Sequence, residues 1–219
     1  KEIDQIVRIA GSGIQSIIKK KSIFKIISRF LLKRLYRNSK NIIAVSMNTK
    51  KLMESENEFF SDNKIRLIYN GIDSSFVQRE KDLSLIPEIK QNERTFILLT
   101  VSRLLPRKGQ DFVIKALAKI NNKNIKYICV GEGSYKEKYK SLVKSLRLED
   151  NVIFPGWVDR PKIESLAKIS IASLAPYKNI DNYIVNTPNK IVDALLLGLP
   201  ILSPLRGEVG DLIESNKIG

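Results

Sequence analysis

The sequence predicts an α/β protein in which parallel sheets carry helices on their faces. Short apolar runs of strand length alternate with segments of helical spacing, and this alternation repeats along most of the chain. Parallel strands need a crossover connection, usually a helix, so the alternation indicates βαβ units. Mixed charge around Pro87 interrupts the pattern and indicates a linker. We therefore expect a folded part at residues 1–75, a linker at 76–94 and a second folded part at 95–219.

The first half contains three expected strands and two expected helices. Ser22 is a good helix N-cap, because a hydroxyl oxygen can accept a hydrogen bond from a free N–H of the first turn, and Ser46 starts a second helix. The turn-forming sequences at 11–13 and 70–71 close the first and the last strand. The expected strands cover 5–10, 41–45 and 64–69, and the expected helices cover 22–38 and 46–54.

The second half contains five expected strands and five expected helices. Pro161 begins one helix, where its missing N–H does no harm, and Gly198 follows the end of another. Proline followed by glycine at 155–156 predicts a turn. The expected strands are 96–101, 125–130, 152–154, 169–174 and 200–203, and the expected helices are 110–120, 135–146, 161–168, 188–197 and 209–215.

The composition is that of an ordinary globular protein, with 43% hydrophobic and 28% charged residues among 219. The single cysteine, Cys129, lies in an apolar run, and we interpret it as a small core residue in a reducing compartment. No run of about 18 apolar residues occurs, so no transmembrane helix is expected, and no signal peptide is visible. Because the chain begins at Lys1 without a methionine, we expect a fragment of a longer protein.

The charge is the most unusual bulk property, since the formal net charge is +15 and the chain has no histidine. Such a surface attracts polyanions, meaning nucleic acid, acidic lipid or phosphorylated metabolites. The lack of histidine excludes, within this chain, mechanisms that need a histidine base or metal ligand. The expected helix at 22–38 carries a basic stripe of Lys25, Arg29, Lys33 and Arg37. This stripe either rests on anionic lipid headgroups or is a solvated helix face.

The loops that follow the strands are the expected site, because ligands of parallel sheets bind beyond the carboxyl ends of the strands. One such loop lies between the strand at 96–101 and the next helix, and it carries Arg103, Arg107 and Lys108. Arg103 offers a fork of donors and Lys108 a point charge, a combination suited to a diphosphate. The alternative is a turn with solvated cations. The loops expected to converge are 103–108, 131–133, 176–190 and 203–208.

Two further loops carry candidate binding residues. Gly131 and Gly133 let a ligand approach the backbone closely, unless they only form a turn. Residues 188–190 (Pro-Asn-Lys) open a helix whose free N–H groups and lysine make a second anion site. Asp193 lies one turn further along, where it can accept hydrogen bonds from a ribose or simply balance the helix dipole.

Four motifs of the second half occur in the order typical of a known family: 101–109 (VSRLLPRKG), 130–133 (VGEG), 152–156 (VIFPG) and 193–200 (DALLLGLP). Together they resemble the donor-binding half of the retaining GT-B glycosyltransferases called family 4. Residues 44–46 (AVS) and 69–73 (YNGID) resemble that family's last acceptor-domain strand and its inter-domain crossing. Residues 5–13 resemble a strand and loop in the middle of the acceptor domain.

The resemblance implies a GT-B fold of two Rossmann-like domains, the first of them partial, and a UDP- or GDP-sugar donor. It implies transfer with retention of the anomeric configuration, no required metal ion, and no cofactor besides the donor substrate. By resemblance, Arg103 and Lys108 grip the donor diphosphate and stabilise the departing nucleoside diphosphate.

The resemblance also suggests roles for the other candidate residues. Asp193 matches the family's glutamate that holds the ribose hydroxyls. Pro188, Asn189 and Lys190 resemble the Pro-x-Lys loop of a subgroup that builds surface polysaccharides. The residues expected where the nucleotide is accommodated are Gly131, Glu132 and Gly133.

Several positions depart from the family pattern. The family's sugar-contacting glutamate, eight residues before the ribose glutamate, is replaced by Val185, and Asp181 is the nearest acid. Asp193 is one methylene shorter than the family's ribose residue, and Gly13 stands where many relatives have an aspartate. The family's acceptor-side histidine is absent from this chain.

The leading interpretation is a glycosyltransferase that moves a sugar to a saccharide or lipid-linked acceptor, in cell-surface polysaccharide or glycolipid synthesis. We expect it in the cytoplasm, peripheral on the inner face of the plasma membrane through the basic stripe. The alternatives are a non-catalytic nucleotide- or nucleic-acid-binding module and an inactive truncated transferase. No nucleic-acid partner is expected, because the 7% aromatic residues do not alternate with basic ones as stacking platforms would.

Overall fold

The computed structural model describes residues 6–9, 23–56, 60, 62–71, 94–178 and 188–219. The chain divides into two compact units, each built on a parallel sheet that alternates with helices, which confirms the predicted α/β class. The first unit contains residues 1–71, 179–188 and 206–211, and the second contains 72–178, 189–205 and 212–219. Almost the whole expected linker lies outside the described residues, so the division at 75 and 95 stays a prediction.

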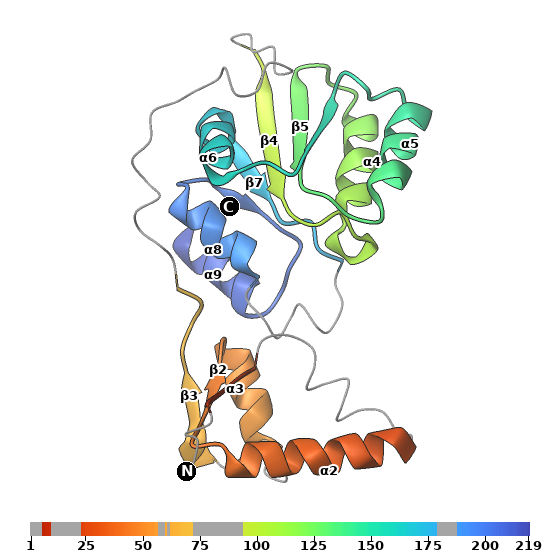
Figure 1. Ribbon diagram of the computed structural model, residues 1–219. Coiled ribbons are helices and arrows are strands. Elements are labelled where there is room, and N and C mark those ends of the chain that lie inside the picture. Colours follow the sequence, from red (N-terminus) through yellow and green to blue (C-terminus); the bar gives the residue numbers. More distant parts are fainter. Residues whose placement is uncertain (1–5, 10–22, 57–59, 61, 72–93, 179–187) are drawn as a thin grey trace. The chain divides into compact units, whose positions relative to one another are not determined.

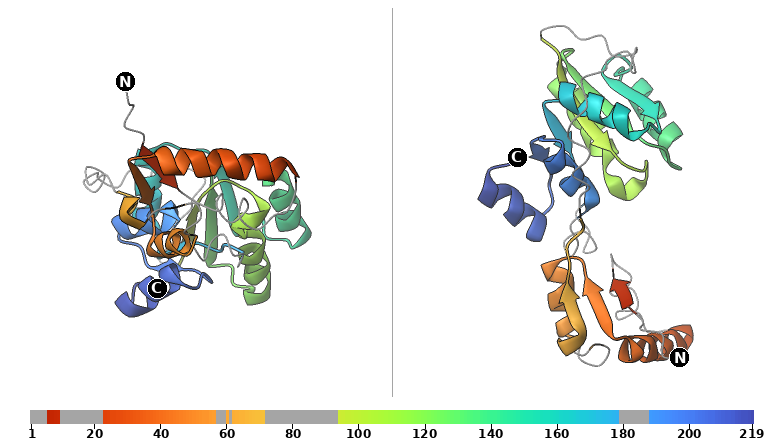
Figure 2. Two further views of the ribbon diagram at one scale, coloured as in Figure 1. Left: turned by 90° about the horizontal axis from the view of Figure 1, so that it is seen from below. Right: turned by 60° about the vertical axis from the view of Figure 1, so that its left-hand side comes forward.

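The first unit has a three-stranded parallel sheet in the order β1–β2–β3, which can be followed from red to yellow-orange in the right-hand view of Figure 2. Ser46, which the sequence placed at the start of the helix after β2, is its N-cap, because its Oγ accepts a hydrogen bond from Thr49 N at 3.0 Å. The elements are β1 (Ile6–Ile9), α2 (Ile23–Asn38), β2 (Asn41–Ala44), α3 (Met47–Glu54), the 3₁₀ helix η1 (Asp62–Lys64) and β3 (Ile65–Leu67).

Among the described side chains of α2, only those of the last turns pack into a core. Leu35 and Tyr36 join a cluster that contains Ile42 and Met53. Phe30 and Leu31, which the periodicity places on the same apolar face, are 65% and 59% exposed. The amphipathic pattern thus predicted the helix correctly, but Phe30 and Leu31 of its expected apolar face are exposed.

The second unit has a five-stranded parallel sheet in the order β6–β5–β4–β7–β8, of which Figure 1 labels β4, β5 and β7. Its strands are β4 (Phe96–Val101), β5 (Ile125–Val130), β6 (Val152–Gly156), β7 (Ala172–Leu174) and β8 (Ile201–Leu202). The helices of this half of the chain are the 3₁₀ helix η4 (Pro106–Lys108), α4 (Gln110–Ile120), α5 (Lys136–Ser145), α6 (Arg160–Ile169), α8 (Asn189–Leu196) and α9 (Glu208–Asn216).

Helices cover both faces of this sheet, with α4 and α5 on one face and α6 on the other (Figure 1). Alternation along each strand divides the core, because successive side chains point to opposite faces. Ile97 and Leu99 of β4 pack with Leu166 of α6. Tyr127 and Cys129 of β5 pack with α4 and α5, so Cys129 is the buried core residue that its apolar run predicted.

The strand order reverses between β4 and β7. The chain runs from β4 outward through β5 and β6, then returns to the other side of β4 with β7 and β8. Leu98 and Leu99 pair with Ala172 and Ser173, so the carboxyl ends of β4 and β7 lie side by side. Such a reversal opens a crevice in which ligands of doubly wound sheets bind.

Some predicted boundaries in this unit differ from the structure for a visible physical reason. The turn predicted at 155–156 belongs to β6, an edge strand, where the missing N–H of Pro155 breaks no ladder. Ile169 ends α6 instead of beginning a strand. Arg160, not Pro161, is the first residue of α6, because the Asp159 carboxylate caps the helix by accepting from Lys162 N at 3.3 Å. None of the helices in the described ranges is long and apolar enough to cross a bilayer.

Candidate functional site

The loop after β4 contacts the loop after β7, at the place where the strand order reverses. Gly109 has φ +77°, and a Cβ there would lie 1.6 Å from the carbonyl oxygen of Pro176. Lys178 N donates to Arg107 O at 3.3 Å. The two predicted site loops therefore converge, and glycine is needed where they touch.

Buried polar side chains form hydrogen bonds to the loop that follows β4. Gln110 is fully buried, and its Nε2 donates to Ser102 Oγ at 2.9 Å and to Arg103 O at 3.2 Å. Tyr139 Oη donates to Leu105 O at 3.0 Å. These contacts give the backbone that carries Arg103 and Lys108 a defined path. Sequence reasoning missed Gln110 and Tyr139, although a polar residue at the first position of an otherwise apolar helix face was a visible signal.

Lys108 and Lys190 meet at the ring of Tyr177. Each ammonium nitrogen lies 4.5 Å from the ring centroid, and Lys108 Nζ also donates to Tyr177 Oη at 3.3 Å. The Lys190 nitrogen is buried and has no hydrogen-bond partner among the described residues. The structure thus brings together two predicted anion-binding residues that are more than 80 positions apart in the sequence.

This placement lowers the pKa of both lysines. Burial, and then the positive charge of Lys108, lower the pKa of Lys190 to about 7. Burial, and then the charges of Arg107 and Arg103, lower the pKa of Lys108 to about 8. Cys129 does not offset these charges, because burial raises the pKa of its thiol to about 12 and the thiol is neutral where the lysines titrate. A bound anion would relieve this concentration of like charge.

Three more predicted residues are near this lysine pair in charge or in sequence: Arg103 acts on Lys108, and Pro188 and Asn189 immediately precede Lys190. Arg103 is exposed, and its charge reaches Lys108. Pro188 immediately precedes α8, and the exposed Asn189 is its first residue. The start of α8 therefore presents Lys190 at the end where the helix dipole is positive, as the sequence predicted.

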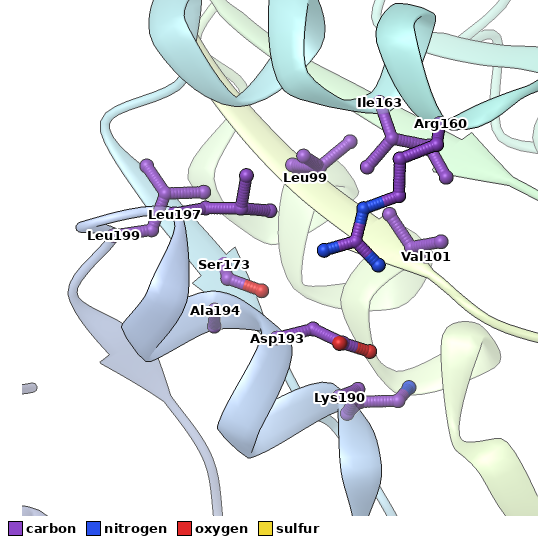
Figure 3. Close-up of a pocket in the computed structure, with 10 residues that line it drawn as sticks. All are labelled: Leu99, Val101, Arg160, Ile163, Ser173, Lys190, Asp193, Ala194, Leu197 and Leu199. Atoms are coloured by element: carbon purple, nitrogen blue, oxygen red, sulfur yellow. The ribbon is translucent and has the colours of Figure 1, made fainter. Parts of the chain in front are cut away.

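A cavity of about 50 Å³ lies against β4 and β7, between α6 and α8 (Figure 3). One side of it is apolar and includes Leu99, Leu197 and Leu199. On the other side the guanidinium of Arg160 reaches from α6 toward the part of α8 that carries Asp193 (Figure 3). The cavity therefore combines an apolar wall with groups that can accept and donate hydrogen bonds.

Two opposing effects act on the pKa of Asp193. Although part of the residue is exposed, burial of the carboxyl group raises its pKa, and the Arg160 guanidinium opposes this. Arg160 Nε also lies 3.7 Å from Glu164 Oε1. Sequence reasoning missed Arg160, whose position next to Pro161 suggested only a helix start.

The glycines at 131 and 133 make room for the chain's own backbone. A Cβ at Gly131, where φ is +127°, would lie 2.1 Å from Ser102 O, and one at Gly133 would lie 2.2 Å from Leu104 O. Glu132 between them forms an ion pair with Lys136 at 2.5 Å. The residues follow β5 at the expected sheet edge, but the close approach observed there is between two loops of the protein.

Of the positions that depart from the family pattern, the structure describes Asp193, which lies in α8. Gly13, Asp181 and Val185 lie outside the described residues. Within the described ranges, no three acidic or cysteine side chains gather in a way that could hold a metal ion.

Two family models match the chain. The model of the family "Glycosyl transferases group 1" matches residues 83–219, and that of "Glycosyltransferase Family 4" matches residues 14–76. An uncharacterised glycosyltransferase of Methanocaldococcus jannaschii is 27% identical over 205 residues, which are 90% of this chain and 47% of the relative.

A second relative is the N-acetylgalactosamine-N,N'-diacetylbacillosaminyl-diphospho-undecaprenol 4-alpha-N-acetylgalactosaminyltransferase of Campylobacter jejuni. It is 25% identical over 167 residues, which are 74% of this chain and 42% of the relative. The chain thus spans less than half the length of these two curated relatives.

A solved structure shows the same fold. The Anabaena protein HepE, crystallised with UDP and glucose, superposes with a TM-score of 0.67 at 22% identity, over 88% of this chain and 51% of HepE. The parallel sheets, their helices and this similarity identify a GT-B fold. Because a single family model matches more than half of its residues, the chain belongs to the glycosyl transferases group 1 family.

Proposed function

We propose that this chain carries the donor site of a glycosyltransferase that moves a sugar from a nucleoside-diphosphate sugar to a saccharide or lipid-linked acceptor. The observation that carries the proposal is the Lys190 ammonium group, which is buried without a hydrogen-bond partner among the described residues. An unsatisfied buried cation is costly, so a site of this kind is built for an anion that supplies the missing partner.

The diphosphate is the part of the donor that fits best. Lys108 and Lys190 share the Tyr177 ring, and Arg103 stands close enough to Lys108 to lower its pKa. Three cations from two strand-end loops can neutralise the charge that develops on a departing nucleoside diphosphate. This supports the proposal that side chains, not a divalent metal ion, stabilise the leaving group. The crystallised complexes of HepE with UDP, with UDP and glucose, and with UDP-glucose favour UDP over GDP as the first nucleotide to test.

The remaining donor-binding residues are assigned by their places around the lysine pair. We assign Asp193 to the ribose hydroxyls, because its carboxylate lines a cavity beside the lysine pair. The loop of Gly131, Glu132 and Gly133 borders the same sheet edge, and Pro188 and Asn189 lead into α8. Retention of the anomeric configuration belongs to the proposal through the family resemblance. Nuclear magnetic resonance of the product anomer tests it, and an inverted anomer would overturn it.

Isothermal titration with the full-length protein tests the diphosphate site. We expect UDP to bind at least about tenfold more tightly than UMP, since the second phosphate adds charge-assisted hydrogen bonds. Lys190→Met, which keeps an unbranched apolar chain, should remove most of this difference. UDP lacking the ribose hydroxyls should bind about tenfold more weakly than UDP if Asp193 has its assigned role. Equal affinity for UDP and UMP, or tighter binding of DNA than of UDP at physiological salt, would contradict the proposal.

We also propose that α2 brings the protein to an anionic membrane surface, where lipid-linked acceptors such as that in the name of the Campylobacter relative are found. Phe30 and Leu31 are exposed on α2, and the helix carries Arg34 and Arg37 on exposed positions nearby. Liposome sedimentation should show binding to acidic but not to neutral vesicles, and Phe30→Ser with Leu31→Ser should reduce it. Binding that is independent of acidic lipid and of salt would rule this out.

A further inference from the structure

The contact between two lysines and one tyrosine has a specific geometry. The Lys108 and Lys190 nitrogens each lie 4.5 Å from the centroid of the Tyr177 ring. Tyr177 is only 2% exposed, and its hydroxyl accepts the hydrogen bond from Lys108 Nζ at 3.3 Å. One buried ring therefore contacts both ammonium groups.

The position of the ring is determined by the loop after β7. Tyr177 N donates to Ala175 O at 2.9 Å, and the next residue, Lys178, is bonded to Arg107 O at 3.3 Å. Pro176, on the other side, abuts Gly109. The backbone of Tyr177 is thus held between two points at which the β7 loop touches the β4 loop, and its ring is buried at this contact.

The ring compensates for the repulsion between the lysines. Two ammonium groups in a partly buried site repel each other, and the charge of Lys108 contributes to the lowered pKa of Lys190. The negative face of an aromatic ring attracts a cation, most strongly where water is excluded. An aliphatic side chain of similar size has no such face, and the flexible lysine stems would then move the charges apart.

We propose that Tyr177 is the positioning residue of the anion site: its ring pairs Lys108 with Lys190 so that both charges face the second phosphate of a nucleoside diphosphate. This inference rests on the proposed donor function and adds a residue to it. It assigns to Tyr177 the selectivity for a diphosphate over a monophosphate, and not the binding of the nucleoside.

The test is the ratio of the dissociation constants for UMP and UDP, measured by titration calorimetry on the full-length protein. Tyr177→Phe keeps the ring and should preserve the wild-type ratio within about threefold. Tyr177→Leu removes the ring and should lower the ratio by about tenfold, mainly by weakening UDP. Tyr177→Met is a second ring-less variant that fills the buried space with a flexible apolar chain.

A matched control is available at Tyr135. Its ring contacts Lys138 at 4.4 Å but lies at the start of α5, outside the lysine pair, so Tyr135→Leu should leave the ratio unchanged. A wild-type ratio near one would overturn the donor function itself. A normal wild-type ratio that persists in Tyr177→Leu and Tyr177→Met, or an equal loss of UMP and UDP binding in both, would overturn the role of Tyr177 alone.

Discussion

Binding of UDP is expected to weaken by about 30-fold or more when the pH rises from about 6.5 to about 8.5. Only the charged form of a lysine attracts the diphosphate, and the pKa values of Lys190 and Lys108 in the ligand-free protein are lowered to about 7 and about 8. Each unit of pH above a lysine's pKa therefore costs about tenfold in affinity. UDP itself keeps its charge over this range, because the second pKa of a terminal phosphate is about 6.

The range between these pH values contains few other titrating groups. The chain has no histidine, and burial raises the pKa of Cys129 to about 12. Titration calorimetry at several pH values measures the effect, and Lys190→Met should flatten the part of the curve near pH 7. A dissociation constant for UDP that does not change with pH in the wild type would refute the assignment.

The affinity for UDP should fall as the pH rises, whereas the free energy of unfolding of the ligand-free protein should rise. The folded pKa values of both lysines lie below the value of about 10.4 for an unfolded lysine. Between about pH 7 and 10 the unfolded chain therefore binds more protons, and the free energy of unfolding rises with pH. A melting temperature that rises from pH 7 to 9, together with a UDP-induced shift that shrinks, would be the signature of this site.

Gly109→Ala should be the most disruptive small substitution in the donor-binding half. The new Cβ would lie 1.6 Å from the carbonyl oxygen of Pro176, a backbone atom that no side-chain rotation can move. The positive φ adds a further penalty. We expect a loss of about 3–4 kcal/mol and a melting temperature lower by about 10 °C. Because Gly109 follows Lys108 and Pro176 precedes Tyr177, the affinity for UDP should fall by at least about tenfold as well.

Gly198→Ala is the matched control for this substitution. Gly198 has a similar positive φ of +68°, but a Cβ there meets nothing within 4 Å. The free energy of unfolding of Gly198→Ala should therefore fall by only about 1 kcal/mol, which is the cost of alanine at a positive φ, and the affinity for UDP should stay the same. Thermal unfolding of the two variants separates conformational strain from the clash. If both lost the same stability, the contact between the β4 and β7 loops would not be important.

The sequence by itself determined the order and type of the elements. Strand and helix periodicity depend on neighbours within a few residues, so β4, α4 and β5 were predicted with the bounds that the structure has. The same local signals placed Arg103, Lys108, Lys190 and Asp193 after strands or at a helix start, where parallel sheets bind ligands. The boundary errors at 155–156 and at Ile169 arose because edge position and helix continuation depend on other segments.

Only the tertiary structure decided how the site is assembled. The pairing of Lys108 with Lys190 and the contact of both with Tyr177 join segments that lie far apart in the chain, and no local pattern encodes such a distance. The contacts of the glycines were likewise not predictable from local sequence patterns. Their presence predicted close approach, but only the fold reveals that backbone, at Pro176, Ser102 and Leu104, is what approaches. Backbone preference is a local property, whereas contact is decided by the packing of strands that the chain brings together from a distance.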